Sequence, residues 1–533
     1  APTPIVAVPP AADSRPVIVM PTPLVAPVSP EPSVASPAKV VAPVVPAGFV
    51  GTNPVGWGAI GTPQPTPAAP AAPRPLIELT TLRLMQTKGL ITAEEYEAAL
   101  KDLNDSMGTR GADSNTLTLG KWKTTLYGYV QADMMYHSTQ SFPDYSGNLQ
   151  VARPDTLAGQ NGRFQATIRD SRFGLRLQAP ALGSVRVSGL MEMDFLGPTG
   201  TIGTTVSEAS FFVNANFRVR HAYLKVETPI VDILFGHYWD LFGHQPSYFP
   251  TIVQWPGLVG ELFGRTIQLR LSHNFKSDYV NVELSAAAMR PPQRDSGVPE
   301  GQAGLRMTFN KWTSWHTGYL TGTSLTPASI AVSGTVRAFA VPEFSAKPTR
   351  TNSVIGSGIA VNAYLPIVPA TKNNKDNSLS LIGEFVTGKS INDVYTGLSG
   401  GVANAALPNP TMATPAPTYT APIDAGFVAY NDKGVLMQPH WTTFLVGLEY
   451  YLPFVGGRVG LFGNVSHSQL ADAATFPNPA KVRDHENFYD VGLFFDPTET
   501  LRFGADYAHI DDVYADGVKA KNDAGQVTGF FFF

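Results

Sequence analysis

The chain has 533 residues, of which 43% are hydrophobic and only 15% are charged, with a formal net charge of −4 and no cysteine. The lack of cysteine excludes a disulfide scaffold, thiolate metal sites and a cysteine nucleophile. So small a net charge indicates no nucleic-acid partner. No stretch reaches about 18 uninterrupted apolar residues, so a helical membrane span is excluded as well.

Residues 1–75 are rich in Ala, Pro and Val, as in the string 67–73. Proline at this density blocks helix formation and pairing inside a sheet, so the segment is predicted to be an extended, polyproline-like arm. We interpret this arm as a spacer. The alternative is a segment that docks on a partner or on the cell wall.

Residues 76–104 change character and predict a short helical oligomerisation segment. Apolar residues recur at helical spacing over 76–85, and Gly89 is a C-cap signal. Thr92 and Glu95 form a capping box that opens a second helix. Two helices this short do not bury a core alone, so we expect copies to associate in a bundle or coiled coil, with a solvated monomeric pair as the alternative. Residues 105–120 are a linker of Gly, Asn, Ser and Thr.

Residues 121–533 predict an all-β transmembrane barrel. Over 126–136 every second residue is apolar, small or aromatic, while Tyr127, Gln131 and Asp133 occupy the other face. A strand with this period has one face in oil and one in water. Strands of about ten residues that recur in this way are the signature of an outer-membrane barrel, and sixteen antiparallel strands can be laid out. Because such a barrel must be exported, we read the chain as a processed mature form.

Short and long connections alternate along the predicted barrel, which assigns them to its periplasmic and extracellular sides. Aromatic residues near the short turns, such as Trp315 and Tyr451, are predicted to form the periplasmic girdle. An even number of strands puts both termini in the periplasm. The predicted location is the outer membrane of a Gram-negative bacterium, with lipid and lipopolysaccharide around the barrel and peptidoglycan or a periplasmic protein as the candidate partner of residues 1–104. The short turns are predicted at 181–184, 227–232, 274–278, 310–311, 452–457 and 496–500, and the long loops at 139–163, 198–215, 240–264, 290–301, 322–351, 390–437, 470–486 and 511–523.

Strand parity assigns charged side chains to the lumen, because a charge on the lipid face near the midplane costs about 2–4 kcal/mol. A basic ladder in a water-filled pore attracts anions, so an anion preference is predicted. Two alternatives stay open: a cation preference, or arginines that merely brace the wall by pairing with the carboxylates Asp133, Asp170, Glu192, Asp194 and Glu283. The predicted pore-lining residues are Arg172, Arg176, Arg186, Glu192, Asp194, Arg218, Arg220, Arg270, Arg306 and Asp133.

The loop at 240–264 differs from the other long connections, since it is rich in aromatic residues and prolines and poor in charge. An exposed loop has no need of so many apolar groups, whereas a loop folded inward packs them on the barrel wall. We therefore predict a constriction loop inside the lumen, with Asp240, Tyr248, Trp255 and Glu261 at the constriction. The alternative is a loop that contacts a neighbouring subunit.

The sequence predicts neither an enzyme nor a bound cofactor or metal. The ten histidines are scattered, and no Gly-x-Ser-x-Gly element stands near one of them. His237 and His244 lie seven residues apart, but a zinc site needs three or four ligands held closely together.

Five segments carry a family likeness, namely 89–96 (GLITAEEY), 126–133 (LYGYVQAD), 170–176 (DSRFGLR), 220–224 (RHAYL) and 235–242 (FGHYWDLF). They resemble segments of the trimeric sixteen-stranded outer-membrane porins, most closely the DcaP-like and phosphate-selective porin groups. The likeness covers roughly 76–275, and the rest of the chain matches only in pattern. It implies an outer-membrane homotrimer with a periplasmic helical bundle that passes small, often negatively charged solutes. The long Pro-rich arm departs from this family, and so does the lack of the lysine runs expected of a phosphate-specific channel.

These patterns together predict a porin for passive diffusion of small hydrophilic solutes, with an anion preference, through a constricted pore in each subunit of a trimer. The alternative is a structural anchor, in which residues 1–104 tether the outer membrane to the cell wall or to another assembly. A plugged lumen favours the anchor, and an open one favours diffusion.

Overall fold

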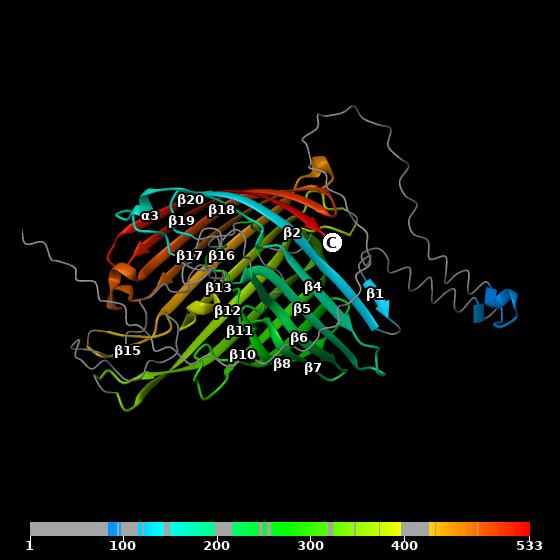
Figure 1. Cartoon of the computed structure of the whole chain (residues 1–533), viewed down its shortest axis with the longest axis horizontal. Helices are drawn as coiled ribbons and strands as arrows, with labels where there is room; N and C mark the ends of the chain where they lie inside the picture. The colour runs from blue at the N-terminus through cyan, green and yellow to red at the C-terminus, as the bar shows by residue number, and fades with distance from the viewer. Residues whose placement is uncertain are drawn as a thin grey trace, which may run out of the picture. The chain divides into compact units, whose positions relative to one another are not determined.

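The barrel is seen in a computed structural model of the chain (Figure 1). In the helical segment, the backbone amide of Glu95 donates to the Thr92 hydroxyl (3.1 Å) and the Thr92 amide donates to the Glu95 carboxylate (2.8 Å), which is a capping box. The arm and most of 76–104 lie outside the described residues. No helix in the described part of the chain is long and apolar enough to cross a membrane. The structure describes residues 84–92, 95–96, 116–119, 122–142, 150–197, 216–244, 249–252, 257–317, 323–345, 348–372, 374–395, 426–431, 433–476 and 478–533.

Sixteen antiparallel strands close into a barrel, which confirms the predicted fold class. Each strand pairs with the next along the chain, and β20 returns to pair with β2 from Tyr129↔Phe532 to His137↔Ala524. Figure 1 shows this closure, with β2 in cyan beside β20 in red. The strands are β2 (Trp122–His137), β3 (Arg163–Thr167) with β4 (Arg172–Gln178) as one interrupted strand, β5 (Arg186–Gly197), β6 (Asn216–Glu227), β7 (Asp232–Trp239), β8 (Arg265–Phe275), β9 (Val280–Met289), β10 (Glu300–His316), β11 (Ser324–Pro342), β12 (Thr351–Val368), β13 (Leu379–Lys389), β16 (His440–Tyr451), β17 (Val459–Leu470), β18 (Arg483–Thr498), β19 (Leu501–Tyr514) and β20 (Lys519–Phe532).

A few smaller elements accompany the barrel. The strand β1 (Thr116–Leu119), inside the predicted linker, pairs with the start of β2. A two-stranded ribbon, β14 (Ala429–Tyr430) with β15 (Leu436–Met437), and the single helical turn α3 (Leu157–Gln160) lie in the long connections. The 3₁₀ turns η1 (Asn392–Val394), η2 (Pro453–Val455), η3 (Ala473–Thr475) and η4 (Pro479–Lys481) lie between strands.

The two faces of the barrel wall alternate as the period of a β-strand requires. On β16, Phe444, Val446 and Leu448 point outward and are exposed, whereas Leu445 and Glu449 point inward and are buried. The same exposure of large apolar side chains recurs on the outer face of strands from β2 to β20. An apolar outer face over a polar interior is the arrangement of a barrel that sits in lipid.

This orientation gives a direct stability test on β18. We expect Val491→Arg, at an outward position in mid-strand, to destabilise the folded barrel by about 2–4 kcal/mol, because it puts a charge into the hydrocarbon layer. Phe454→Arg, at the exposed η2 turn, is the matched control and should cost at most about 1 kcal/mol. Urea-dependent refolding into lipid vesicles measures both, and equal costs would contradict the assigned lipid face.

Three predictions about connections are wrong. The predicted long loop at 511–523 lies mostly in β19 and β20, which are joined by residues 515–518 alone. The predicted turn at 310–311 lies within β10, and the predicted loop at 322–351 is mostly the nineteen-residue strand β11. The pairing register shifts between Phe309 and Thr313, so β10 bulges there and continues instead of turning. The Ser-, Gly- and Thr-rich composition of β11 is typical of a loop, but its polar side chains alternate inward, as Ser333 and Thr335 do.

The predicted girdle position of Tyr451 is also wrong. Its parity on β16 matches that of Glu449, so the ring points into the lumen and is buried. The period of the strand therefore predicts the face of Tyr451 correctly, whereas its position near a turn does not.

The candidate pore and its lumen loop

Residues 240–264, here called the lumen loop, join β7 to β8 but bind strands much further round the wall. Near the start of the loop, the Phe242 amide donates to the Gln302 side chain on β10 (2.6 Å). Near its end, the Leu262 amide donates to the Glu384 carboxylate on β13 (2.9 Å). β7 and β8 are the fifth and sixth strands of the barrel and β13 is the eleventh, so the loop extends into the lumen.

The described middle of the lumen loop reaches the far wall. Asn464 on β17 donates its side-chain amide to the Pro250 carbonyl (2.7 Å). The Thr251 hydroxyl donates to Asp490 on β18 (2.9 Å), and the Ile252 amide donates to Asp506 on β19 (3.3 Å). Because β17, β18 and β19 are the thirteenth to fifteenth strands, the loop spans the barrel interior.

Apolar packing holds the lumen loop against the wall. Phe249, Val259 and Leu262 are buried in one cluster with wall residues such as Trp441 and Leu445. At about 25 cal/mol per Å² of apolar surface, burial of aromatic and aliphatic groups makes the folded-in position strongly favourable. The richness in apolar residues that marked this loop in the sequence thus has a structural cause.

The four residues predicted at the constriction are only partly described. Glu261 is buried in the lumen loop and accepts the Phe249 amide (3.1 Å). The amide of Asp240 donates to the Gly264 carbonyl (3.0 Å), which closes the neck of the loop. Tyr248 and Trp255 lie outside the described residues.

Five of the predicted pore-lining residues form one network on β4, β5 and β6. Arg218 binds Asp194 with two nitrogens (3.0 and 2.6 Å), and Arg220 bridges Asp194 (3.0 Å) and Glu192 (2.9 Å). Arg172 lies 3.5 Å from Glu192. Paired charges of this kind hold their geometry, because breaking one pair leaves a buried charge uncompensated.

The network carries more positive than negative charge. A fourth arginine, Arg265, stacks on the rings of Trp239 (4.7 Å) and Phe263 (5.6 Å), and it forms no ion pair with a described carboxylate. Even when the buried Asp170 is counted with the two paired carboxylates, four arginines face three acids. The guanidinium nitrogens Nη2 of Arg172 and Arg220 and Nη1 of Arg265 have no hydrogen-bond partner among the described residues.

Arg265 was missed in the sequence because it directly follows the predicted loop at 240–264. The predicted loop bounds gave it no strand face, although it is the first residue of β8. Trp239 stands opposite Arg265 in the register of β7 and β8. An arginine and an aromatic residue at the two ends of the predicted loop were the available signal that Arg265 belongs to the site.

The other predicted pore residues form no ion pair with this network, although Arg176 lies next to it, because the hydroxyl of Tyr127 donates to Glu192 (2.9 Å). Arg306 pairs with Glu283, and Arg270 donates to Gln268 (2.9 Å); Arg270 and Arg306 line a cavity of about 280 Å³ beside His244. Arg176 stacks on Tyr127 (5.2 Å), and the exposed Arg186 stands opposite Glu227 in the strand register. Asp133 accepts the side-chain amides of Gln131 (3.0 Å) and Gln526 (3.1 Å).

The described histidines and carboxylates include no group of three placed to hold a metal ion. His244 points at Glu283 (3.5 Å), and His237 stands on the outer face of β7 opposite Ile267. These two histidines therefore do not share a site.

A closed sixteen-stranded barrel with an apolar exterior, a charged lumen and an inward loop defines a barrel of the outer-membrane porin fold. The outer membrane channel DcaP of Acinetobacter baumannii matches 78% of this chain and 99% of its own, with a TM-score of 0.53 and 15% identity. An anion-selective porin from Comamonas acidovorans matches 77% of this chain and 100% of its own (TM-score 0.44, 10% identity). OprB of Pseudomonas putida matches 76% and 94% (TM-score 0.44, 12% identity). At such identities the likeness to DcaP concerns the fold, and no protein-family model or curated protein matches the sequence.

Proposed function

We propose that this chain is an outer-membrane porin that lets small hydrophilic solutes diffuse passively, with a preference for anions, through a constricted pore in each subunit of a homotrimer. The observation that carries the anion preference is the surplus of arginine around Glu192 and Asp194 on one side of the lumen. Fixed positive charge beside a narrow aqueous path raises the local concentration of anions.

The lumen loop supports the constriction. It spans the interior from β7 to β19, so a solute passes only through the space left beside it. The helical segment with its Thr92–Glu95 capping box supports the trimer, because such short helices gain stability by packing against copies of themselves. Residues 1–104 would then lie in the periplasm, within reach of peptidoglycan or another envelope protein.

The test is the reversal potential of the purified chain in a planar bilayer between unequal salt concentrations. Anion selectivity gives a potential of the sign set by the anion gradient, and its size falls as salt screens the arginines. A potential of the opposite sign would overturn the anion preference and leave the pore itself intact. The mass of the folded protein in detergent tests the trimer separately.

A further inference from the structure

The hairpin of β10 and β11 extends past the periplasmic end of its neighbours. The Asn310 side chain donates to the Ser277 carbonyl (2.8 Å), which marks the level of the turn between β8 and β9. Beyond that level β10 continues to His316. The hairpin therefore has a tip that no strand on the β9 side accompanies.

One side of this tip packs on the end of β12 and on the connection that follows it. The Trp312 indole donates to the Pro366 carbonyl (2.6 Å), and the Thr313 hydroxyl donates to the Ala370 carbonyl (2.9 Å). The end of β12 and the connection that follows it therefore support the tip.

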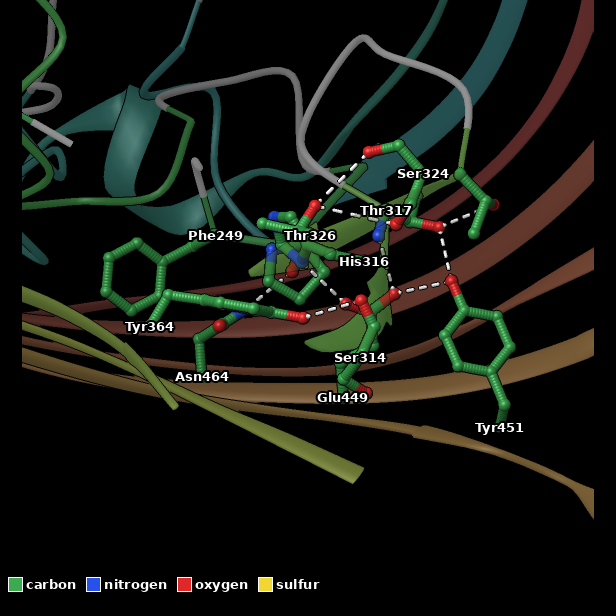
Figure 2. Close-up of polar contacts among 12 residues, drawn as sticks. Phe249, Ser314, His316, Thr317, Ser324, Thr326, Tyr364, Glu449, Tyr451 and Asn464 are labelled. Carbon is green, nitrogen blue, oxygen red and sulfur yellow. Dashed lines mark hydrogen bonds and ion pairs between the residues drawn. The ribbon is translucent and has the colours of Figure 1, made fainter. Parts of the chain in front are cut away.

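The end of the tip is bonded to β16. His316 Nδ1 lies 2.7 Å from the Glu449 carboxylate, whose other oxygen accepts the Thr317 amide (2.9 Å). The Thr317 hydroxyl shares a hydrogen bond with Tyr451 Oη (2.6 Å). All four side chains are buried, and Figure 2 shows them converging on one point.

A second set of contacts ties the tip to the opposite wall. Arg502 on β19 donates to the Thr323 hydroxyl (2.6 Å) and is itself fixed by Asp496 on β18 (2.6 and 2.9 Å). β10 and β11 are the eighth and ninth strands, and β18 and β19 are the fourteenth and fifteenth. Strands so far apart in a ring of sixteen face each other, so the tip crosses the lumen.

The tip lies close to the lumen loop but is a separate obstacle. The Tyr364 hydroxyl donates to the Ser314 carbonyl (3.3 Å; Figure 2), and Tyr364 belongs to the same buried apolar cluster as Phe249 of the lumen loop. The lumen loop enters from the extracellular side and the tip from the periplasmic side. A solute that has passed one still has to pass the other.

The mouth next to the tip is positively charged. A cavity of about 630 Å³ has Trp315 and Thr323 of the hairpin in its wall. The charged side chains that line it comprise four cations and two carboxylates, namely Lys372, Lys375, Arg458, Arg502, Asp496 and Glu499. Such a lining concentrates anions at the periplasmic exit.

We propose that the tip, residues 313–317 with Thr323, is a second constriction at the periplasmic mouth that acts in series with the lumen loop and restricts the passage of small anions. This inference rests on the proposed porin function. Glu449, Tyr451 and Arg502 are the positioning residues that hold the tip in place, and they do not belong to the arginine network.

Two obstacles in series give a distinctive conductance pattern, because their resistances add. Removing one obstacle leaves the resistance of the other in place, so each single removal raises the conductance by less than the removal of both. Removing both produces a gain larger than the sum of the two single gains. Two obstacles on parallel paths would instead give gains that simply add.

The test compares four proteins in planar bilayers: the wild type, a tip-release variant (Glu449→Gln with Tyr451→Phe), a lumen-loop deletion, and the combination. We expect a larger conductance step for each change and a more than additive step for the combination. The tip-release variant should also admit larger solutes into vesicles. Tyr450→Phe with Glu343→Gln is the matched control, since both side chains are bonded outside the lumen, and it should leave the conductance unchanged.

Folding is checked by the heat-dependent gel mobility of the barrel. If the tip-release variant does not fold, Thr317→Val takes its place, because it removes the hydroxyl that is bonded to Tyr451, Thr323 and Arg502 and keeps the backbone bond to Glu449. Two results together would overturn the second constriction while the porin function stands. The folded tip-release variant would have the conductance and solute cut-off of the wild type, and the combination would have no larger conductance than the lumen-loop deletion. No conductance from any of the four would overturn the porin function itself.

Discussion

Replacing Arg265 by glutamine should weaken the anion preference of the pore. Arg265 has no carboxylate partner among the described residues, so its loss removes one positive charge and leaves Arg172, Arg218 and Arg220 paired as before. A unit charge about 7 Å from a passing anion is worth roughly 0.6 kcal/mol in water. That energy corresponds to about a threefold fall in anion permeability, read as a smaller reversal potential across a salt gradient.

Arg350→Gln is the matched control, because this arginine is 84% exposed beside Glu343, away from the network. It removes the same charge from the chain and should leave the reversal potential unchanged. Equal shifts in the two variants would mean that net charge, and not the charge of the network, sets the selectivity. High salt should erase the difference from wild type, since the Debye length falls to about 3 Å at 1 M.

Deleting the lumen loop should raise the conductance step of the pore. The Asp240 amide and the Gly264 carbonyl are 3.0 Å apart, so a short Gly-Ser linker in place of 244–260 can close the neck without strain on β7 or β8. The deletion empties the lumen of Phe249, Val259 and their neighbours, and we expect at least about a twofold larger step.

The deletion should also lower stability, because apolar wall residues such as Trp441 and Leu445 lose their cover. A milder variant, Thr251→Val, removes the hydrogen bonds of this hydroxyl to Asp490 (2.9 Å) and Asp506 (3.4 Å) and keeps the lumen loop, so the conductance should stay close to wild type. If the barrel without the lumen loop folds and has the conductance step of the wild type, the lumen loop does not limit the flow of ions.

The faces of the strands were predictable because the membrane fixes them. Lipid on one side and water on the other make the period of two almost obligatory, so Arg172, Glu192 and Asp194 were assigned together to the lumen. The ion pair of Arg172 is diagonal, since Arg172 stands opposite Asp194 in the register but lies 3.5 Å from Glu192, which stands opposite Gly174. Parity gives the face of a residue but not its partner across the strands.

The periplasmic hairpin was missed for a related reason. The bulge after Phe309 changes the pairing of β10 without a signal in hydrophobic pattern, and the polar residues of β11 have the composition of a loop. The inward path of the lumen loop could be predicted, since Phe249 and Ile252 lie in a stretch too apolar for an exposed loop. The carboxylates that receive its backbone, such as Glu384, come from distant strands and have no local signature.

The central claim is that the barrel stays open although the lumen loop and the hairpin tip both cross it. The most direct measurement is the swelling rate of vesicles that carry the whole chain, placed in an isosmotic solution of a small sugar. An open pore predicts swelling faster than that of protein-free vesicles, with a rate that falls steeply as the sugar becomes larger. Folded protein that gives no swelling and no ion current would contradict the porin function and leave the barrel as an anchor for residues 1–104.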